Sequence, residues 1–279
     1  MSNPVKTPDS ISTAHQALNA WWEAAGVDIP PVPKKARPTR PTSPSTPARS
    51  PHVAASPASP PPKSPAAPAP ALARQAAASA ESLEALKTAL ENFDAGPVKA
   101  GARHTVFARG NPKAPIMIIG EAPGRDEDEQ GLPFVGASGQ LLDRMLRTAG
   151  FGEDDIYITN AFNWRPPKNR KPTPDELAMT LPFLERHIAL IAPKIILLVG
   201  ASPMQAVLGL SAGITRARGQ WHDYTVKNAD GTNSDQTIPA LPTFHPAFLL
   251  RAPLAKRDVW HDLQSIRERL AAIDGKQCH

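Results

Sequence analysis

The sequence predicts an α/β fold, a three-layer α/β/α sandwich around a central four-stranded, mostly parallel sheet. Short, fully apolar runs of strand length alternate along the chain with longer segments whose apolar residues recur every three or four positions. This alternation is typical of strands that are buried between two layers of helices. Each apolar run also ends at a small or polar residue, as expected where the loops of a parallel sheet gather at the carboxyl ends of its strands.

Four apolar runs give the expected strands. Because loops at the carboxyl ends of parallel strands form the ligand sites of such sheets, we expect the residues that end these runs to lie close together. The runs are residues 116–119, 156–159, 194–199 and 241–244, and they lead into Gly120, Asn160, Gly200 and His245.

The segments between the runs carry helix signals. Ser138 is expected to cap one helix, and Thr173 with Glu176 forms a capping box at the start of the next. Pro182 should kink that second helix. A further helix is expected before the first strand and another at the end of the chain, over residues 71–93 and 255–273.

The first 70 residues differ in composition from the rest. Residues 1–29 are expected to hold one short helix, whose Trp21 and Trp22 would dock on the main domain or bind a partner protein. Residues 30–70 contain fifteen of the 33 prolines, six Lys or Arg and no Asp or Glu. This composition is typical of an extended, disordered linker. The folded domain would then span residues 71–279, with its core at about 98–273.

Charge and cysteine content exclude several functions. The chain carries a formal net charge of +5, but the linker alone accounts for it, so nucleic-acid binding by the domain must be argued from local sites. The single cysteine, Cys278, excludes an intramolecular disulfide and any site that needs two thiolates. No stretch is long and apolar enough to span a bilayer. We therefore expect a cytoplasmic protein without a membrane partner.

The first candidate motif is the loop after the run at 116–119. Its small residues, Gly120 to Gly124, allow main-chain N–H groups to approach a ligand, and five acidic residues lie between Glu121 and Glu129. The loop cannot be a Walker phosphate loop, because the Gly-Lys-Ser/Thr ending is missing and the acids would repel a phosphate. Alone, it would be an ordinary solvated acidic loop. Phe134, just beyond it, is either a core residue or a plate on which a flat ring stacks.

The second motif follows the run at 156–159. The Asn160 side chain has a donor and an acceptor on one planar group, which suits the reading of a base edge, although a single asparagine is more often a turn residue. A proline-containing loop with three cations follows, and it could hold a phosphodiester backbone. The three cations are Arg165, Lys168 and Arg170.

The third motif follows the run at 241–244. His245 precedes a proline, an apolar group at 248–250 and the cation Arg251. A histidine in this position is usually structural, but an apolar wedge beside it could fill the gap that an extruded base leaves in DNA.

Taken together, and in this order, the motifs resemble the family 4 uracil-DNA glycosylases. The resemblance covers about residues 93–270. Secondary matches are the segments 93–111, 213–215 and 218–219. The main matches are the segments 120–124, 133–136, 165–167, 169–170 and 245–247, together with Asn160.

The resemblance implies a monofunctional enzyme of base-excision repair. It would hydrolyse the N-glycosidic bond of a deoxyuridine that is flipped out of DNA, and leave an abasic site. Phe134 would stack on uracil, Asn160 would read its O4 and N3–H, and His245 would donate to O2. Ala122 and Gly124 would help to hold the ring, while Glu121 and Glu127 would line the site and position water.

The same resemblance implies a set of DNA contacts around the site. The expected partner is uracil-containing DNA, and the expected protein is a nucleoid-associated monomer. The residues assigned to DNA are Arg165, Lys168, Arg170, Arg218, Phe248, Leu249 and Arg251.

The sequence departs from the family in its metal ligands. Most family 4 members carry an iron–sulfur cluster on four cysteines, but Trp164 and Thr180 stand at two of those positions, and Cys278 is the only cysteine. We therefore expect a branch without cofactor or metal, in which packing around Trp164 replaces the cluster.

Two alternative functions remain open. The same pocket could serve a glycosylase for hypoxanthine or xanthine, and the lost cluster together with the basic linker could indicate a DNA-binding homologue without catalysis. For a glycosylase, Ala122 stands where another glycosylase family has an aspartate, so a strong general base is excluded there. Catalysis would rest on stabilisation of the leaving base.

Overall fold

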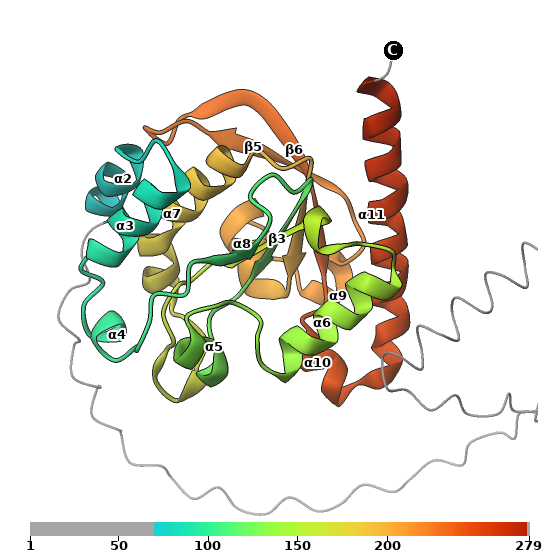
Figure 1. The fold of residues 1–279 in the computed structure, drawn as a ribbon, viewed down its shortest axis with the longest axis horizontal. Coiled ribbons are helices and arrows are strands. Elements are labelled where there is room, and N and C mark those ends of the chain that lie inside the picture. Colours follow the sequence, from blue (N-terminus) through green and yellow to red (C-terminus); the bar gives the residue numbers. More distant parts are fainter. Residues whose placement is uncertain (1–69, 278–279) are drawn as a thin grey trace, which may run out of the picture.

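A six-stranded sheet forms the centre of the molecule in the computed structural model, which describes residues 70–277 (Figure 1). The helix expected in residues 1–29 and the linker expected up to residue 69 lie outside the described residues. The sheet order is β1-β3-β2-β4-β6-β5. The strands are β1 (Ala108–Gly110), β2 (Ile116–Gly120), β3 (Ile156–Asn160), β4 (Ile195–Val199), β5 (His222–Lys227) and β6 (Asn233–Thr243).

The four central strands are the predicted ones, and they are parallel. Their register places Gly120 of β2 opposite Asn160 of β3, and Val199 of β4 opposite Thr243 of β6. The strand ends therefore lie on one edge of the sheet, as expected. The sheet is larger than predicted, because the edge strands β1 and β5 add antiparallel pairs. Only one face of β5 is buried, which gives it a weak apolar signal.

Helices cover both faces of the sheet and complete the predicted three-layer sandwich (Figure 1). Alternate residues of β2 face opposite layers: Ile116 and Ile118 pack with α6, α10 and α11, whereas Met117 and Ile119 pack with α7 and α8. These helices are α6 (Ala137–Thr148), α7 (Pro174–Ile191), α8 (Ala201–Leu208), α10 (Pro246–Arg251) and α11 (Lys256–Gln277).

A helical pair packs outside α7 and forms a third apolar cluster, which includes Leu86, Leu90 and Trp164. The helix predicted over 71–93 is in fact two helices, α2 (Pro70–Ala78) and α3 (Leu83–Asn92). The break arises because the Ser82 side chain accepts a hydrogen bond from Ala85 N at 3.1 Å and so starts a new helix.

Two of the predicted helix starts can be compared with the structure. The capping box at Thr173 is confirmed by its two hydrogen bonds with Glu176. Ser138, by contrast, lies inside the first turn of α6, whose cap is Gly136. The short elements are α4 (Pro97–Ala100), α5 (Arg125–Gln130), α9 (Ile214–Ala217) and the 3₁₀ turns η1 (Glu153–Asp155), η2 (Pro167–Asn169) and η3 (Pro253–Ala255).

The described part of the chain contains no candidate membrane-spanning helix. Among residues 70–277, every helix is too short or too polar to cross a bilayer.

Candidate active site

A cleft of about 950 Å³ opens at the carboxyl ends of the parallel strands. Residues that follow all four central strands line it, so the predicted meeting of the strand ends takes place in the folded chain. These residues are Glu121 after β2, Asn160 at the end of β3, Gly200 after β4 and His245 after β6.

Phe134, Asn160 and His245 converge in this cleft from separate parts of the chain. The Phe134 and His245 rings are stacked, with centroids 5.8 Å apart and planes 28° apart. Gly120 lies between the side chains of Asn160 and Phe134. A Cβ at Gly120 would stand 2.4 Å from Asn160 Oδ1 and 2.5 Å from the Phe134 ring. The absence of a side chain at residue 120 therefore allows the amide and the aromatic ring to share one narrow space.

His245 is the N-cap of α10, and this position fixes its tautomer. Ala247 N donates a hydrogen bond to His245 Nδ1 at 3.1 Å, so Nδ1 carries a lone pair and the ring proton is on Nε2. Burial lowers the pKa of His245, while the nearby carboxylates of Glu121 and Glu127 act in the opposite direction. The ring is therefore neutral at pH 7 and presents Nε2–H as a donor.

Glu127 has both carboxylate oxygens occupied by main-chain N–H groups. Its Oε2 accepts from Gly124 N at 3.0 Å, and its Oε1 accepts from Val135 N at 3.0 Å and from Gly136 N at 2.9 Å. The carboxylate thus ties the two ends of the acidic loop together and completes the cap of α6. This geometry favours a structural role in the site over the water-positioning role expected from the sequence.

Glu121 is held by a residue that the sequence reasoning did not identify. Ser202 Oγ, in the first turn of α8, donates to Glu121 Oε2 at 2.8 Å. Phe162 N donates to the Glu121 carbonyl oxygen at 3.0 Å. The only sequence signal for Ser202 is a small polar residue two positions after Gly200, at the end of a predicted strand.

Cations surround the mouth of the cleft. Arg165, Arg170 and Arg251 line it together with Phe248. Arg165 donates to Asn169 Oδ1 at 2.7 Å, and Arg170 makes a two-pronged pair with the Glu176 carboxylate at 2.7 and 2.6 Å. Lys168, in η2, is exposed beside them. The loop therefore presents several positive groups in a rigid arrangement.

Two residues assigned to DNA contact do not face the cleft mouth. Leu249 is fully buried in the core, because α10 turns it inward and leaves Phe248 and Leu250 exposed at 39% and 48%. Arg218 pairs with Asp262, donates to the Asp258 carbonyl oxygen at 2.7 Å and lies over the Phe244 ring. Arg218 thus joins α9 to α11. Leu249 has no exposed surface and therefore cannot contact DNA as expected, whereas the assignment of Arg218 to DNA stays a prediction.

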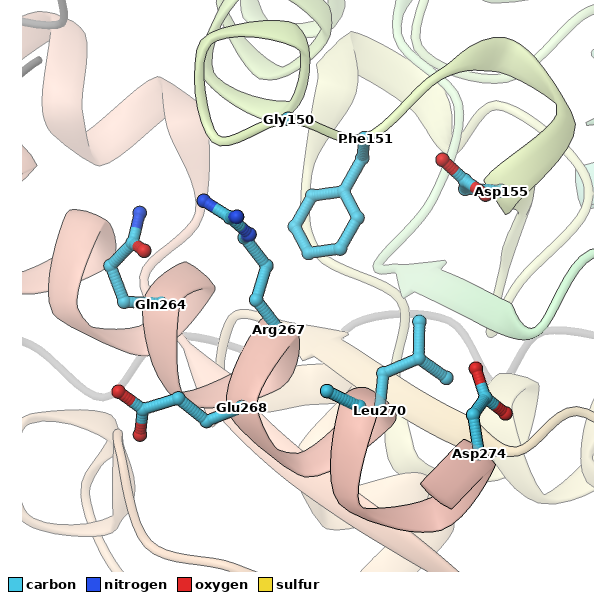
Figure 2. Close-up of a pocket in the computed structure, with 9 residues that line it drawn as sticks. Gly150, Phe151, Asp155, Gln264, Arg267, Glu268, Leu270 and Asp274 are labelled. Carbon is cyan, nitrogen blue, oxygen red and sulfur yellow. The ribbon is translucent and has the colours of Figure 1, made fainter. Parts of the chain in front are cut away.

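A second cavity, of about 490 Å³, lies near the start of β3, on the edge of the sheet opposite to the cleft. Arg267 extends from α11 toward Gly150 and Phe151 (Figure 2). The two aspartates that line this cavity already have partners. Asp155 accepts a hydrogen bond from Gly152 N at 2.7 Å, and Asp274 forms an ion pair with Lys194. None of the predicted site residues lines this cavity, so the chemistry is assigned to the cleft.

The fold and the cleft define an α/β/α protein in which an aromatic ring, a carboxamide and a neutral histidine meet at the carboxyl ends of the parallel strands. Comparison with known families is more specific. The family model of the uracil DNA glycosylase superfamily matches residues 107–264, more than half of the chain. The chain belongs to this superfamily.

Individual relatives support the same placement. The chain is 38% identical over 170 residues to a type-4 uracil-DNA glycosylase of Sulfurisphaera tokodaii, and the match covers 59% of this chain and 74% of that protein. It is 36% identical over 163 residues to a type-4 uracil-DNA glycosylase of Archaeoglobus fulgidus, with 57% and 78% covered. The corresponding values for Thermotoga maritima are 37% over 158 residues, with 56% and 77% covered. The resemblance to family 4 is confirmed.

The iron–sulfur cluster implied by the resemblance does not fit the residues present. Trp164 is 1% exposed, and its Nε1 donates to Thr105 Oγ1 at 3.0 Å. Thr180 is fully buried, and its Oγ1 donates to the Ala161 carbonyl oxygen at 2.9 Å. An indole N–H and a hydroxyl committed to a carbonyl oxygen do not provide the thiolates that such a cluster requires.

Proposed function

We propose that this protein hydrolyses the N-glycosidic bond of deoxyuridine in DNA, releases uracil and leaves an abasic site. Its place in the uracil DNA glycosylase superfamily and its similarity to three type-4 uracil-DNA glycosylases support the proposal. The observation that carries it is the neutral, Nε2-protonated His245 beside Phe134 and Asn160 in one cleft.

Leaving-group stabilisation is the main chemical contribution of His245. Cleavage of the C1′–N1 bond leaves negative charge on uracil, much of it at O2. A fixed N–H donor aimed at that oxygen stabilises the transition state more than the ground state, because the charge develops during the reaction. The Ala247 N–H group keeps this donor on Nε2 and orients the ring.

Asn160 and Phe134 provide base recognition. Uracil presents O4 as an acceptor and N3–H as a donor, which one carboxamide can match with its own donor and acceptor. Cytosine presents the reverse pattern, so a fixed amide leaves a buried polar edge unpaired and discriminates strongly against it. The Phe134 ring, which is 6% exposed, offers an aromatic face on which the base can stack.

The acidic loop acts on the sugar. Loss of the base leaves an oxocarbenium-like deoxyribose, and negative potential near it is stabilising. Glu121 lines the cleft and accepts a hydrogen bond from Ser202, whereas both carboxylate oxygens of Glu127 are taken by main-chain N–H groups. Ala122 cannot activate water, so Glu121 and main-chain carbonyl groups would hold the attacking water. The enzyme would act as a monomer and without a metal cofactor.

Excision of uracil from a defined oligonucleotide tests the proposal. Purified full-length protein is incubated with single- and double-stranded DNA that carries one uracil, and alkali then reveals abasic sites. We expect cleavage of the uracil strand and none of a thymine control. Parallel oligonucleotides with hypoxanthine or xanthine identify a different lesion preference. Absence of product from every substrate would show that the homologue does not catalyse.

Two variants test the assigned roles. Asn160→Ala and His245→Ala should each lower the single-turnover excision rate by about 100-fold or more, as removal of a transition-state donor does in other enzymes. Circular dichroism should show an unchanged fold. Wild-type rates in both variants would mean that the site is assigned wrongly.

A further inference from the structure

The backbone of Phe134 is held in an unfavourable conformation. Its φ is +55°, in the left-handed region that non-glycine residues rarely adopt. A residue in this region costs about 1 kcal/mol or more, and such a conformation persists only when its surroundings enforce it. The ring that is proposed to stack on uracil therefore depends on groups that hold the turn around it.

Arg109 holds the carbonyl side of this turn. Its Nε donates to the Pro133 carbonyl oxygen at 2.8 Å, and its Nη2 is 3.3 Å from the Phe134 carbonyl oxygen. The same Nη2 pairs with Asp143 Oδ1 on α6 at 2.6 Å. One planar guanidinium thus joins three acceptors from two segments, and Arg109 is itself fixed in β1 opposite Ile158 of β3.

The other sides of the turn are also closed. Glu127 accepts from the Val135 and Gly136 N–H groups, which directly follow the Phe134 carbonyl. Gly139 on α6 packs so closely that a Cβ there would stand 1.8 Å from the Phe134 carbonyl oxygen. Arg109 completes this enclosure, yet it is not among the described residues that line the cleft. Any effect of Arg109 on the base is therefore indirect, and its hydrogen bonds lead to the turn that carries Phe134.

We propose that Arg109, oriented by Asp143, is a positioning residue that holds the Phe134 ring in the orientation in which it stacks on the flipped base. The inference rests on the proposed function for its effect on catalysis, but the rigidity of the turn can be measured without activity. Lysine cannot replace Arg109 fully, because an ammonium group lacks the planar fork that reaches the three acceptors.

A double-mutant cycle tests the coupling of Arg109 to Phe134. Arg109→Gln should lower the single-turnover excision rate by about 10-fold to 100-fold, as expected when a stacking group is misplaced by about 1 Å. Arg109→Lys and Asp143→Asn should have smaller effects. Arg267→Gln, which removes a cation from the second cavity, is the matched control and should leave the rate unchanged.

The cycle separates positioning from general stabilisation. If Arg109 acts through Phe134, the variant Arg109→Gln/Phe134→Ala is no slower than Phe134→Ala alone, within about two-fold. A merely structural role would multiply the two losses, and that result would overturn the inference. If Arg109→Gln does not fold, the same cycle is run with Asp143→Asn and decides in the same way.

Hydrogen–deuterium exchange provides the readout that needs no activity. In Arg109→Gln the Val135 and Gly136 amides should exchange at least about 10-fold faster than in the wild type, because the turn opens locally. Amides of β4 should be unchanged. Equal exchange at 135 and 136 would refute the positioning role even if the wild type excises uracil. An inactive wild type would refute the proposed function and leave this measurement to decide on Arg109.

Discussion

At the scale of single residues, Gly120 determines whether the amide and the aromatic ring can share the cleft. Asn160 Oδ1 and the Phe134 ring lie so close to Gly120 that a Cβ on this residue would clash with both. Gly120→Ala should therefore displace one of the two and lower uracil excision by about 100-fold, the effect of a 1 Å misplacement in an enzyme site. Single-turnover rates and circular dichroism measure the effect.

A matched glycine serves as the control for this prediction. Gly213 is close to the cleft residue Ile214, has an ordinary φ and has no atom within 4 Å of an added Cβ. Gly213→Ala should therefore keep wild-type activity. Similar losses in both variants would show that the effect of Gly120→Ala is not specific to the space between Asn160 and Phe134.

The pH dependence of catalysis is the second prediction for a single residue. Burial lowers the pKa of His245 below its ordinary value of about 6.5. The ring stays neutral as the pH falls from 8 to 6.5, and the excision rate should fall only at lower pH, when protonation of Nδ1 breaks the bond from Ala247 N. A pH–rate profile under single-turnover conditions checks this. An inflection at or above pH 6.5 that disappears in His245→Gln would contradict it.

At the scale of secondary-structure elements, a buried histidine joins α7 to the sheet. His187 is 3% exposed, shares a hydrogen bond of 2.8 Å between its Nε2 and the Tyr157 hydroxyl of β3, and stacks on Phe107. Burial lowers the pKa of His187 to about 3. Between pH 6.5 and 3 the unfolded chain binds a proton that the folded chain does not, so the free energy of unfolding falls as the pH falls.

The contribution of His187 can be isolated by substitution. His187→Gln retains a hydrogen-bonding group but cannot titrate. Between pH 6.5 and 4.5, the wild type should lose about 2 kcal/mol more unfolding free energy than His187→Gln, from about 1.4 kcal/mol per pH unit. Urea unfolding at the two pH values measures the difference. An equal fall in unfolding free energy in the wild type and in His187→Gln would indicate that His187 is already protonated in the folded state.

Local signals account for the elements that the sequence predicts correctly. The central strands are continuous apolar runs such as Ile116 to Ile119, and the start of α7 is a capping box within four residues. The elements that were missed depend on distant partners. β1 has only three residues, none of them strongly apolar, and it exists because it pairs with β3, about fifty positions further on.

The same reasoning applies to the site residues. Asn160 and His245 lie where predicted strands end, so the sheet topology brings them together. Phe134 lies beyond α5, and the turn that Arg109 holds brings it into the cleft. The burial of Leu249 and the pairing of Arg218 could not be predicted, for two different reasons. The rotation of α10 about its axis decides which side of the wedge is buried, and Arg218 pairs with an aspartate 44 positions away. Neither relation has a local signature in the sequence.

At the scale of the whole molecule, the folded domain includes α2 and α3, which lie before the stretch that the family resemblance covers. Arg74 of α2 pairs with Glu185 of α7, and Arg186 donates to the Ala80 carbonyl oxygen at 2.8 Å. Leu86 and Leu90 of α3 are buried against the cluster that contains Trp164. These helices cover the apolar cluster that contains Trp164, so they belong to the domain and not to the linker.

Two truncations locate the boundary between domain and linker. Removal of residues 1–69 deletes six Lys or Arg between positions 30 and 69, where no acid is present. Because such cations add salt-sensitive affinity for DNA phosphates, DNA binding in 50 mM salt should weaken, and the difference from the full chain should shrink at 200 mM. Single-turnover excision at saturating enzyme should stay close to the full-length rate, because every residue of the cleft is retained.

Removal of residues 1–92 should have a different effect. It takes away α2 and α3 and leaves Trp164 and Phe183 without their cover. Loss of the buried Leu86 and Leu90 alone predicts a fall in unfolding free energy of at least about 3 kcal/mol, from the cost of emptying a core. Urea unfolding and DNA-binding anisotropy on both truncations distinguish the two effects. If the shorter deletion already lowers stability and abolishes excision, residues before α2 also belong to the folded enzyme.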